Sequence, residues 1–205
     1  KMIQDAGIHR LIQEGWLSQY HHYAIEEYTP NVVAKTFITD RERWGKSVSF
    51  FHTMEQCEQC KGLLADAGVK SEIISGKTPM AKREELLDAF DAGEYPMIIN
   101  IMVLSEGFDC PNLNSVFIRD SGKLPTIQMG GRAFRTHPSK THCNIIQSKC
   151  APWQFTRTAK PSKSFVQRGN NWYSLGDNAI VGRVVKETIA RITNIEVEIP
   201  NFIVS

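Results

Sequence analysis

A regular alternation of short apolar runs and helical patterns between residues 47 and 148 most constrains the fold of this chain. Helical patterns separate the runs, and the run at 97–101 is apolar enough to be buried on both faces. Strands that alternate with helices form a parallel sheet with right-handed crossovers. The sequence therefore predicts an α/β domain with its ligand edge at the carboxyl ends of the strands. The five predicted strands are 47–52, 69–74, 97–101, 115–118 and 143–146.

Local signals predict where the helices begin and end. Thr53 is expected to cap the helix after the first of these strands, and Gly68 is expected to end that helix in the left-handed conformation. Thr78 and Pro79 predict the cap and first residue of the following helix. Asn31 is expected to cap an earlier helix that runs toward residue 44.

The flanking segments have different patterns, which suggests three parts. Residues 2–19 have a helical period, and residues 20–28 alternate in a way typical of an extended segment. After residue 150, a loop precedes a predicted hairpin at 165–173 and a helix from Asn178. We therefore expect a connector (1–45), an α/β domain (46–150) and a small α+β appendage (151–205).

Composition excludes several classes of protein. Hydrophobic residues make up 41% and charged residues 22% of the chain, as in ordinary globular proteins, and the net charge is only +2. No apolar run reaches the roughly 18 residues of a membrane helix. Five cysteines without framework spacing favour a reducing, cytoplasmic compartment. Cys57 and Cys60 form a C-x-x-C pair, but no second pair completes a zinc site, so no metal is expected.

Two arginines form the most suggestive functional pattern. Arg132 and Arg135 lie three positions apart after a Gly-Gly pair, and in a helix both guanidinium groups would share one face. Guanidinium groups suit phosphate oxygens, and two aimed at one place suit the charge of phosphoryl transfer. An exposed basic turn without a ligand is the alternative.

A second pattern, LSEGFDCP at residues 104–111, follows the buried strand at 97–101. It brings two carboxylates, Glu106 and Asp109, to the expected ligand edge, where they suit a ribose hydroxyl or the arginines. No histidine or nucleophile is near in sequence for acid–base work, and an ordinary turn is the alternative.

The sequence Ser-Gly-Lys-Thr at residues 75–78 resembles the end of a P-loop, but we reject it as a nucleotide cradle. The glycine required five positions before Gly76 is replaced by Ser71. Pro79 also removes a backbone N–H group where the P-loop helix would donate one. A loop that touches a phosphodiester backbone remains a possible role.

These patterns together resemble superfamily 2 helicases and translocases. Residues 104–111 are similar to motif V of that family, and QMGGRAFR at 128–135 is similar to motif VI, Q-x-x-G-R-x-x-R. The strand at 47–52 occupies the place of motif IV, and 76–79 with Arg83 resembles the segment between. The match covers 46–148, is nearest to phage and restriction-system DNA helicases, and implies a RecA-like parallel sheet flanked by helices.

The resemblance implies a role for each matching position. Arg132 and Arg135 would meet the γ-phosphate of ATP, with Arg135 as the arginine finger, and Gln128 would couple nucleotide state to the domain interface. A further set would lie at the nucleotide ribose and motif VI: Glu106, Gly107, Asp109 and Gly131. Another set would contact one nucleic-acid strand: Thr53, Gly76, Lys77 and Ser105.

The resemblance also implies partners that this sequence does not supply. ATP with Mg²⁺ would be held mainly by an N-terminal RecA-like domain, because 1–205 contain neither a P-loop nor a D-E-x-x box. We expect DNA as substrate, with RNA not excluded, in the cytoplasm of a bacterial or phage-infected cell, with nucleoid association possible. The family's motif V threonine is replaced by Ile101, and Gln147 stands where relatives often carry an acid.

Two other hypotheses stay open at this stage. A binding or regulatory module that kept the fold and lost the motor would have the same motifs, and an unrelated α/β enzyme would match them by chance. The loop after residue 150 mixes aromatic and basic residues, among them Trp153 and Arg157. It suits either stacking on unpaired bases or an ordinary solvated linker.

Overall fold

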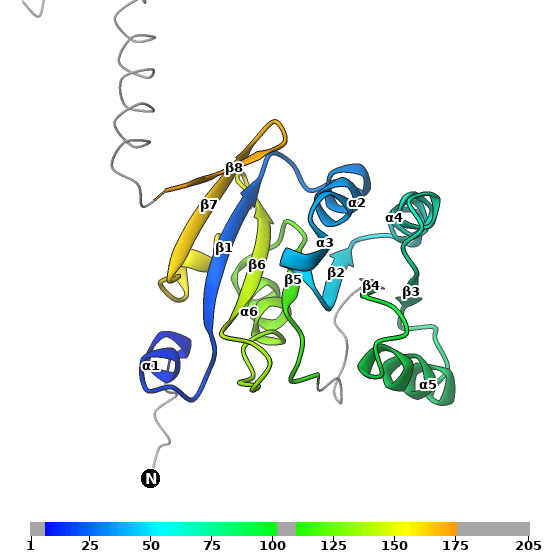
Figure 1. Cartoon of the computed structure of the whole chain (residues 1–205), viewed down its shortest axis with the longest axis horizontal. Helices are drawn as coiled ribbons and strands as arrows, with labels where there is room; N and C mark the ends of the chain where they lie inside the picture. The colour runs from blue at the N-terminus through cyan, green and yellow to red at the C-terminus, as the bar shows by residue number, and fades with distance from the viewer. Residues whose placement is uncertain (1–6, 102–109, 176–205) are drawn as a thin grey trace, which may run out of the picture.

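The computed structural model describes residues 7–101 and 110–175. Its strands form one sheet in the order β3-β4-β2-β5-β6-β1-β7-β8, in which neighbouring strands are parallel except β7 and β8 (Figure 1). The strands are β1 Gln19–Ile25, β2 Ser47–Phe51, β3 Ser71–Ile74, β4 Met97–Ile101, β5 Ser115–Ile118, β6 His142–Ser148, β7 Lys163–Arg168 and β8 Asn171–Ser174. The five predicted strands and the predicted RecA-like α/β class are confirmed.

Helices cover both faces of this sheet and form two apolar layers. Helices α2, α3 and α4 pack on one face, and α1, α5 and α6 pack on the other (Figure 1). The helices are α1 Ile8–Gln13, α2 Pro30–Thr39, α3 Arg41–Trp44, α4 Met54–Asp66, α5 Met80–Asp91 and α6 Lys123–Gly131, with a short 3₁₀ turn η1 at Phe155–Arg157.

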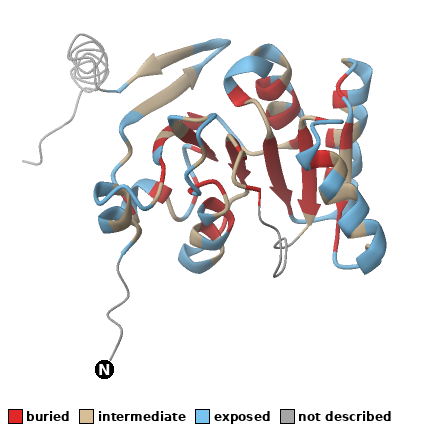
Figure 2. Ribbon diagram, turned by 60° about the horizontal axis from the view of Figure 1, so that its bottom comes forward, coloured by how far each residue is buried: buried red, intermediate tan, exposed pale blue. Residues whose placement is uncertain are grey.

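The central strands are buried on both faces, which explains their continuous apolar sequence. Every residue of β2 and β5 is buried, and Figure 2 shows the middle of the sheet as its most buried part. Successive side chains point to opposite layers, so that Phe50 joins the α5–α6 side and Phe51 joins the α2–α4 side.

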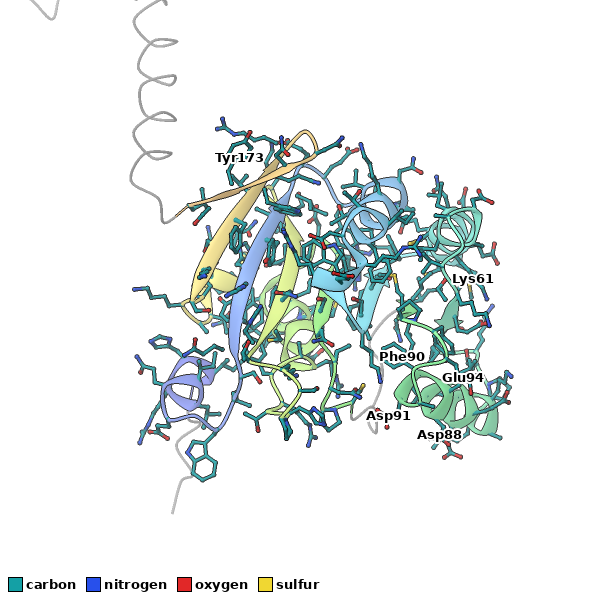
Figure 3. The ribbon with its side chains drawn as sticks, viewed as in Figure 1. Lys61, Asp88, Phe90, Asp91, Glu94 and Tyr173 are labelled. Atoms are coloured by element: carbon teal, nitrogen blue, oxygen red, sulfur yellow. The ribbon has the colours of Figure 1, made fainter. Side chains whose placement is uncertain are left out.

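Helix α5 shows how an amphipathic sequence closes the sheet near β4. Phe90 is fully buried beneath it, whereas Asp88 and Asp91 lie on its outer side (Figure 3). Lys46 covers the Phe90 ring at 5.3 Å and lies 3.8 Å from a carboxylate oxygen of Asp91. The apolar residue therefore faces the sheet and the acids face solvent, as helical period predicts.

Segments outside the motif-bearing region belong to the same sheet. The predicted extended segment forms β1, which lies between β6 and β7 and pairs with both in parallel. The predicted hairpin forms β7 and β8 and turns at Gly169, whose φ is +60°. The division into connector, domain and appendage stays a prediction, and the helix expected from residue 178 lies outside the described residues.

Two of the predicted helix caps are confirmed and two are wrong. Thr53 accepts a hydrogen bond from the Gln56 N–H at 3.2 Å, and Gly68 has the expected left-handed φ of +70°. Asn31 is not a cap, because Thr29 caps α2 through the Val32 N–H and the helix begins at the next residue, a proline.

The other wrong cap is at α5, and the helix expected to run to residue 44 is interrupted. Thr78 accepts a hydrogen bond from the Ser75 N–H, so it closes a turn, and Pro79 holds the N-cap position of α5. Asp40 is non-helical, with φ −148° and ψ 66°, and its side chain caps α3.

The left-handed residue at the end of α4 gives a test of this helix boundary. We expect Gly68→Ala to lower the free energy of unfolding by about 1 kcal/mol, because a side chain disfavours φ +70°. Gly62→Ala is the matched control: it is exposed, lies within α4 and has nothing within 4 Å of its added Cβ, so it should stabilise by about 0.5–1 kcal/mol. Urea unfolding measures both, and equal effects of the same sign would contradict the assignment.

The folded structure favours the neutral forms of two histidines of β1. His21 stacks on His142 with ring centroids 3.8 Å apart, and burial, followed by the charges of His142 and Lys163, lowers the pKa of His21 to about 4. Burial likewise lowers the pKa of His22 to about 4, against a partly opposing hydrogen bond to Gln147. The unfolded chain, with histidine pKa values near 6.5, therefore binds these protons first as pH falls.

We accordingly expect the free energy of unfolding to fall as pH drops from about 6.5 to about 4. His21→Phe keeps an aromatic ring on His142 but removes one titrating group, so its stability should decline less steeply over this range. Denaturant unfolding at several pH values measures the slope. A pH-independent stability, or the same slope in His21→Phe as in the exposed-site control His9→Gln, would contradict this expectation.

Candidate functional site

The two arginines project from a turn that is anchored between them. Helix α6 ends at Gly131, Arg132 is its C-cap, and Arg135 lies beyond it, so the condition under which both guanidinium groups would share one helical face is not met. The chain leaves the helix because Ala133 and Phe134 turn into the core, where they are 0% and 1% exposed. Burial of the intervening pair leaves Arg132 half-buried and Arg135 exposed.

Contacts to β1 and to the loop after β6 fix the backbone of this turn. The Phe134 ring packs edge-on against Tyr20, with centroids 5.3 Å apart, and stacks on Phe155 at 5.4 Å. Ser18 donates through its N–H to the Phe134 carbonyl at 2.8 Å and through its hydroxyl to the Arg135 carbonyl at 2.9 Å. The arginine turn is therefore held against the start of β1.

Lys140 completes the turn and was not among the residues predicted from the sequence. Its Nζ donates to the carbonyls of Ala133 at 2.8 Å and Leu113 at 2.9 Å. Burial lowers the pKa of Lys140, and the two carbonyls, one of them just past the end of α6, replace water as its partners. A lysine shortly after a helix end was the available signal.

The exposed arginine lies beside the segment that leads into β1. Trp16, Leu17, Pro111, Arg135 and Thr136 line an open cavity of about 340 Å³. Trp16 is 71% exposed, which is unusual for an indole, and α1 lies close to the start of β1 (Figure 1). Gln128 and Gly131 are exposed on the outer side of α6. The predicted site residues Ser105, Glu106, Gly107 and Asp109 lie outside the described residues.

The described residues that are predicted to contact a nucleic-acid strand lie at the carboxyl ends of the β-strands, on the opposite side of the sheet from Arg135. Thr53 lies two residues past the carboxyl end of β2, and Gly76 and Lys77 follow that of β3; all three are exposed. Helix α6 begins past the carboxyl end of β5, and the chain after it leads to the start of β6. The helix therefore connects the carboxyl ends of the strands with their amino ends. The structure thus separates the predicted nucleic-acid contacts from the predicted nucleotide contact.

The lysine-containing loop after β3 is closed on itself. Lys77 donates through its N–H to the Ser75 hydroxyl at 3.3 Å, and the Thr78 N–H donates to the Ser75 carbonyl at 3.1 Å. Arg83 reaches the same carbonyl at 3.4 Å. A turn whose N–H groups bond internally offers no phosphate cradle, which agrees with the rejection of a P-loop.

A polar cluster at the carboxyl ends of β2 and β5 was also missed. Arg119 Nη1 lies 3.0 Å from His52 Nδ1 and 2.9 Å from Ser121 Oγ. Among the described residues, Arg119 Nε and Asp120 Oδ1 are buried without a hydrogen-bond partner, and burial raises the pKa of Asp120. Applying the carboxyl-end rule to the strand at 115–118 would have found Arg119 and Asp120.

Other functional classes find little support in the part of the chain described. Cys57 and Cys60 are buried in α4, and burial raises the pKa of each to about 12, so both are thiols. Within 7–101 and 110–175, no three His, Cys, Asp or Glu side chains are grouped to hold a metal ion. Over the same ranges, no helix is long and apolar enough to cross a membrane.

Sequence comparison agrees with this fold and arrangement of motifs. Residues 29–137, about half of the chain, match the family described as the helicase conserved C-terminal domain. The chain therefore belongs to the helicase conserved C-terminal domain family. It is 26% identical over 119 residues to the putative ATP-dependent helicase IRC3 of Saccharomyces cerevisiae, a match that covers 56% of this chain and 17% of that protein.

Solved structures share the fold at low sequence identity. A variant of S. cerevisiae Dbp5 bound to RNA and ADP BeF3 is 17% identical with a TM-score of 0.56, covering 83% of this chain and 45% of that one. The Type ISP restriction-modification enzyme LlaBIII bound to DNA is 15% identical with a TM-score of 0.54, covering 69% and 12%. The chain thus spans less than half of each of these proteins.

Lys140 provides a test of the anchored turn. We expect Lys140→Met to lower the free energy of unfolding by about 1–3 kcal/mol, because it leaves the Ala133 and Leu113 carbonyls without their donor. Lys149→Met is the control, since it breaks an exposed pair with Glu26 and should change stability by less than about 1 kcal/mol. Denaturant unfolding compares them, and equal losses would show that Lys140 does not hold the turn.

Proposed function

We propose that this chain is the C-terminal motor half of an ATP-dependent nucleic-acid helicase or translocase that acts on DNA. The observation that carries the proposal is the pair Arg132 and Arg135, presented around a buried Ala-Phe anchor in a helicase C-terminal domain. The name of the yeast relative, putative ATP-dependent helicase IRC3, supports ATP as the nucleotide that is hydrolysed. Solved proteins of this fold that are bound to DNA and to RNA support a nucleic-acid substrate.

The geometry supports a nucleotide site shared with a second domain. Arg135 is exposed beside Trp16 and Leu17, which lie in the predicted connector (1–45). A P-loop in an N-terminal RecA-like domain would hold the triphosphate and Mg²⁺. Arg135 would act as the arginine finger, and Arg132 would share the charge that develops on the γ-phosphoryl group.

The separation of the two edges suggests how hydrolysis drives movement. ATP would close the cleft between the two motor domains, and hydrolysis would reopen it. Helix α6 runs from the carboxyl edge of the sheet to the arginine turn. A shift of the arginine turn at the nucleotide would therefore move α6 and displace the edge where Thr53 and Gly76 lie. The contacts at that edge would be to the phosphodiester backbone and so independent of sequence.

The arginine finger can be tested in a polypeptide that carries both motor domains. We expect Arg135→Ala to lower strand-stimulated ATPase by about 10³-fold, because it removes the cation that stabilises the transition state. The control Arg41→Ala removes an exposed arginine of α3 on the opposite face and should leave the rate unchanged. A rate within twofold of wild type for Arg135→Ala would exclude the assignment.

The same assay separates the motor from a non-catalytic module. A motor hydrolyses ATP faster when single-stranded, duplex or branched DNA is added, and comparison with RNA identifies its substrate. A two-domain protein that binds a strand but shows no stimulated ATPase would instead indicate a binding or regulatory module with a retained fold.

A further inference from the structure

The loop after β6 presents an indole between two cations. Lys123 Nζ and the Arg157 guanidinium carbon each lie 5.4 Å from the centre of the Trp153 ring. Trp153 is half-buried, whereas both cations are exposed. Lys123 is the first residue of α6, so this group lies where α6 leaves the carboxyl end of β5.

A buried amide fixes the loop that carries this indole. Gln147 is fully buried in β6; its Nε2 donates to the Trp153 carbonyl at 3.1 Å, and its Oε1 accepts from the Phe155 N–H at 2.8 Å. The Trp153 Nε1–H donates to the Thr158 hydroxyl at 3.1 Å. A carboxylate at position 147 accepts only, so it cannot replace the donation to Trp153.

The next aromatic residue, Phe155, packs the loop against α6 and the arginine turn. Phe155 is fully buried and packs on Tyr20 and Phe134, with ring centroids 5.5 and 5.4 Å apart. A Cβ added at Gly130 would come within 2.4 Å of the Phe155 ring, so this glycine makes room for the loop. The loop is therefore a packed element and not a solvated linker.

Other polar side chains lie at the same carboxyl edge of the sheet. Arg119 and His52 lie at the carboxyl ends of the neighbouring strands β5 and β2, and Asp120 follows Arg119 in the chain. Thr53, one of the predicted strand contacts, directly follows His52 at this edge. An aromatic face with flanking cations at such an edge suits bases that stack and phosphates that pair with the cations.

We propose that Trp153 stacks on an unpaired base of a single-stranded nucleic acid whose phosphates contact Lys123 and Arg157. The inference rests on the proposed function and extends it to a residue beyond the helicase motifs. An exposed cation–π contact is weaker than base stacking, so a base displaces one cation from the ring, and that cation moves to a phosphate. Duplex bases are stacked on each other, so the site selects unpaired strands.

Binding of labelled oligonucleotides to this 205-residue chain tests the inference. Fluorescence anisotropy with dT12 and rU12 at low salt should show about tenfold weaker binding for Trp153→Ala. Trp153→Phe keeps a stacking ring and should stay within about threefold of wild type. Trp172→Ala removes a half-buried indole that packs on the opposite face and should bind within twofold of wild type. Circular dichroism checks that each variant is folded at the assay temperature.

The salt dependence provides a readout that a purely structural role would not change. Lys123→Met and Arg157→Met should each reduce the slope of log affinity against log salt by about 0.7, the value for one phosphate of a single strand. Lys35→Met, on the exposed side of α2, should leave the slope unchanged. Unchanged slopes in both Lys123→Met and Arg157→Met would overturn the assignment of these cations to phosphates.

The remaining outcomes distinguish this inference from the function on which it rests. If wild type binds and folded Trp153→Ala binds within twofold, the stacking site is wrong and the proposed function stands. If Trp153→Phe binds as weakly as Trp153→Ala, the indole N–H has a structural role and stacking is excluded. If wild type binds neither oligonucleotide, the nucleic-acid part of the proposed function fails, and this inference fails with it.

Discussion

Tyr20, Phe134 and Phe155 form an aromatic cluster that joins three segments far apart in the sequence. These three rings come from β1, from the turn between the two arginines and from the loop after β6, and each is at most 1% exposed. Aromatic pairs of this kind are worth about 0.5–1.5 kcal/mol each beyond their area burial. The cluster fixes the arginine turn and the Trp153 loop in one packed unit, so both candidate binding elements share a single anchor.

Helix α6 connects the carboxyl ends of the strands, where nucleic acid would bind, with the arginine turn, where the nucleotide would bind. Lys123 begins it at the carboxyl edge, beside Trp153, and Arg132 caps its other end. Gly130 lies near that end and is the point at which Phe155 packs on the helix. A rigid element between the proposed nucleic-acid edge and the proposed nucleotide edge would provide a physical basis for coupling the two ligands.

The fold was largely predictable because the central strands are buried on both faces, so their apolar runs and the intervening helical periods are strong signals. Helix caps were less predictable: several residues can cap, and Thr29 rather than Asn31 does so because the proline after it fits the first helical position. The exit of Arg135 from α6 could not be read from spacing, since it depends on Phe134 packing against two distant segments. Arg119 and Lys140 were missed because both lie outside the recognised motifs and each contacts a residue far away in the chain, His52 and Leu113 respectively.

The proposed function requires that this chain supply one half of a nucleotide site whose other half lies in a P-loop domain. Titration with a fluorescent, non-hydrolysable ATP analogue and Mg²⁺ tests it most directly, on this chain alone and on a polypeptide with both motor domains. We expect saturable binding to the two-domain protein and no saturable binding to the chain alone at the same concentrations. Stoichiometric binding to the chain alone with the affinity of the two-domain protein would contradict it.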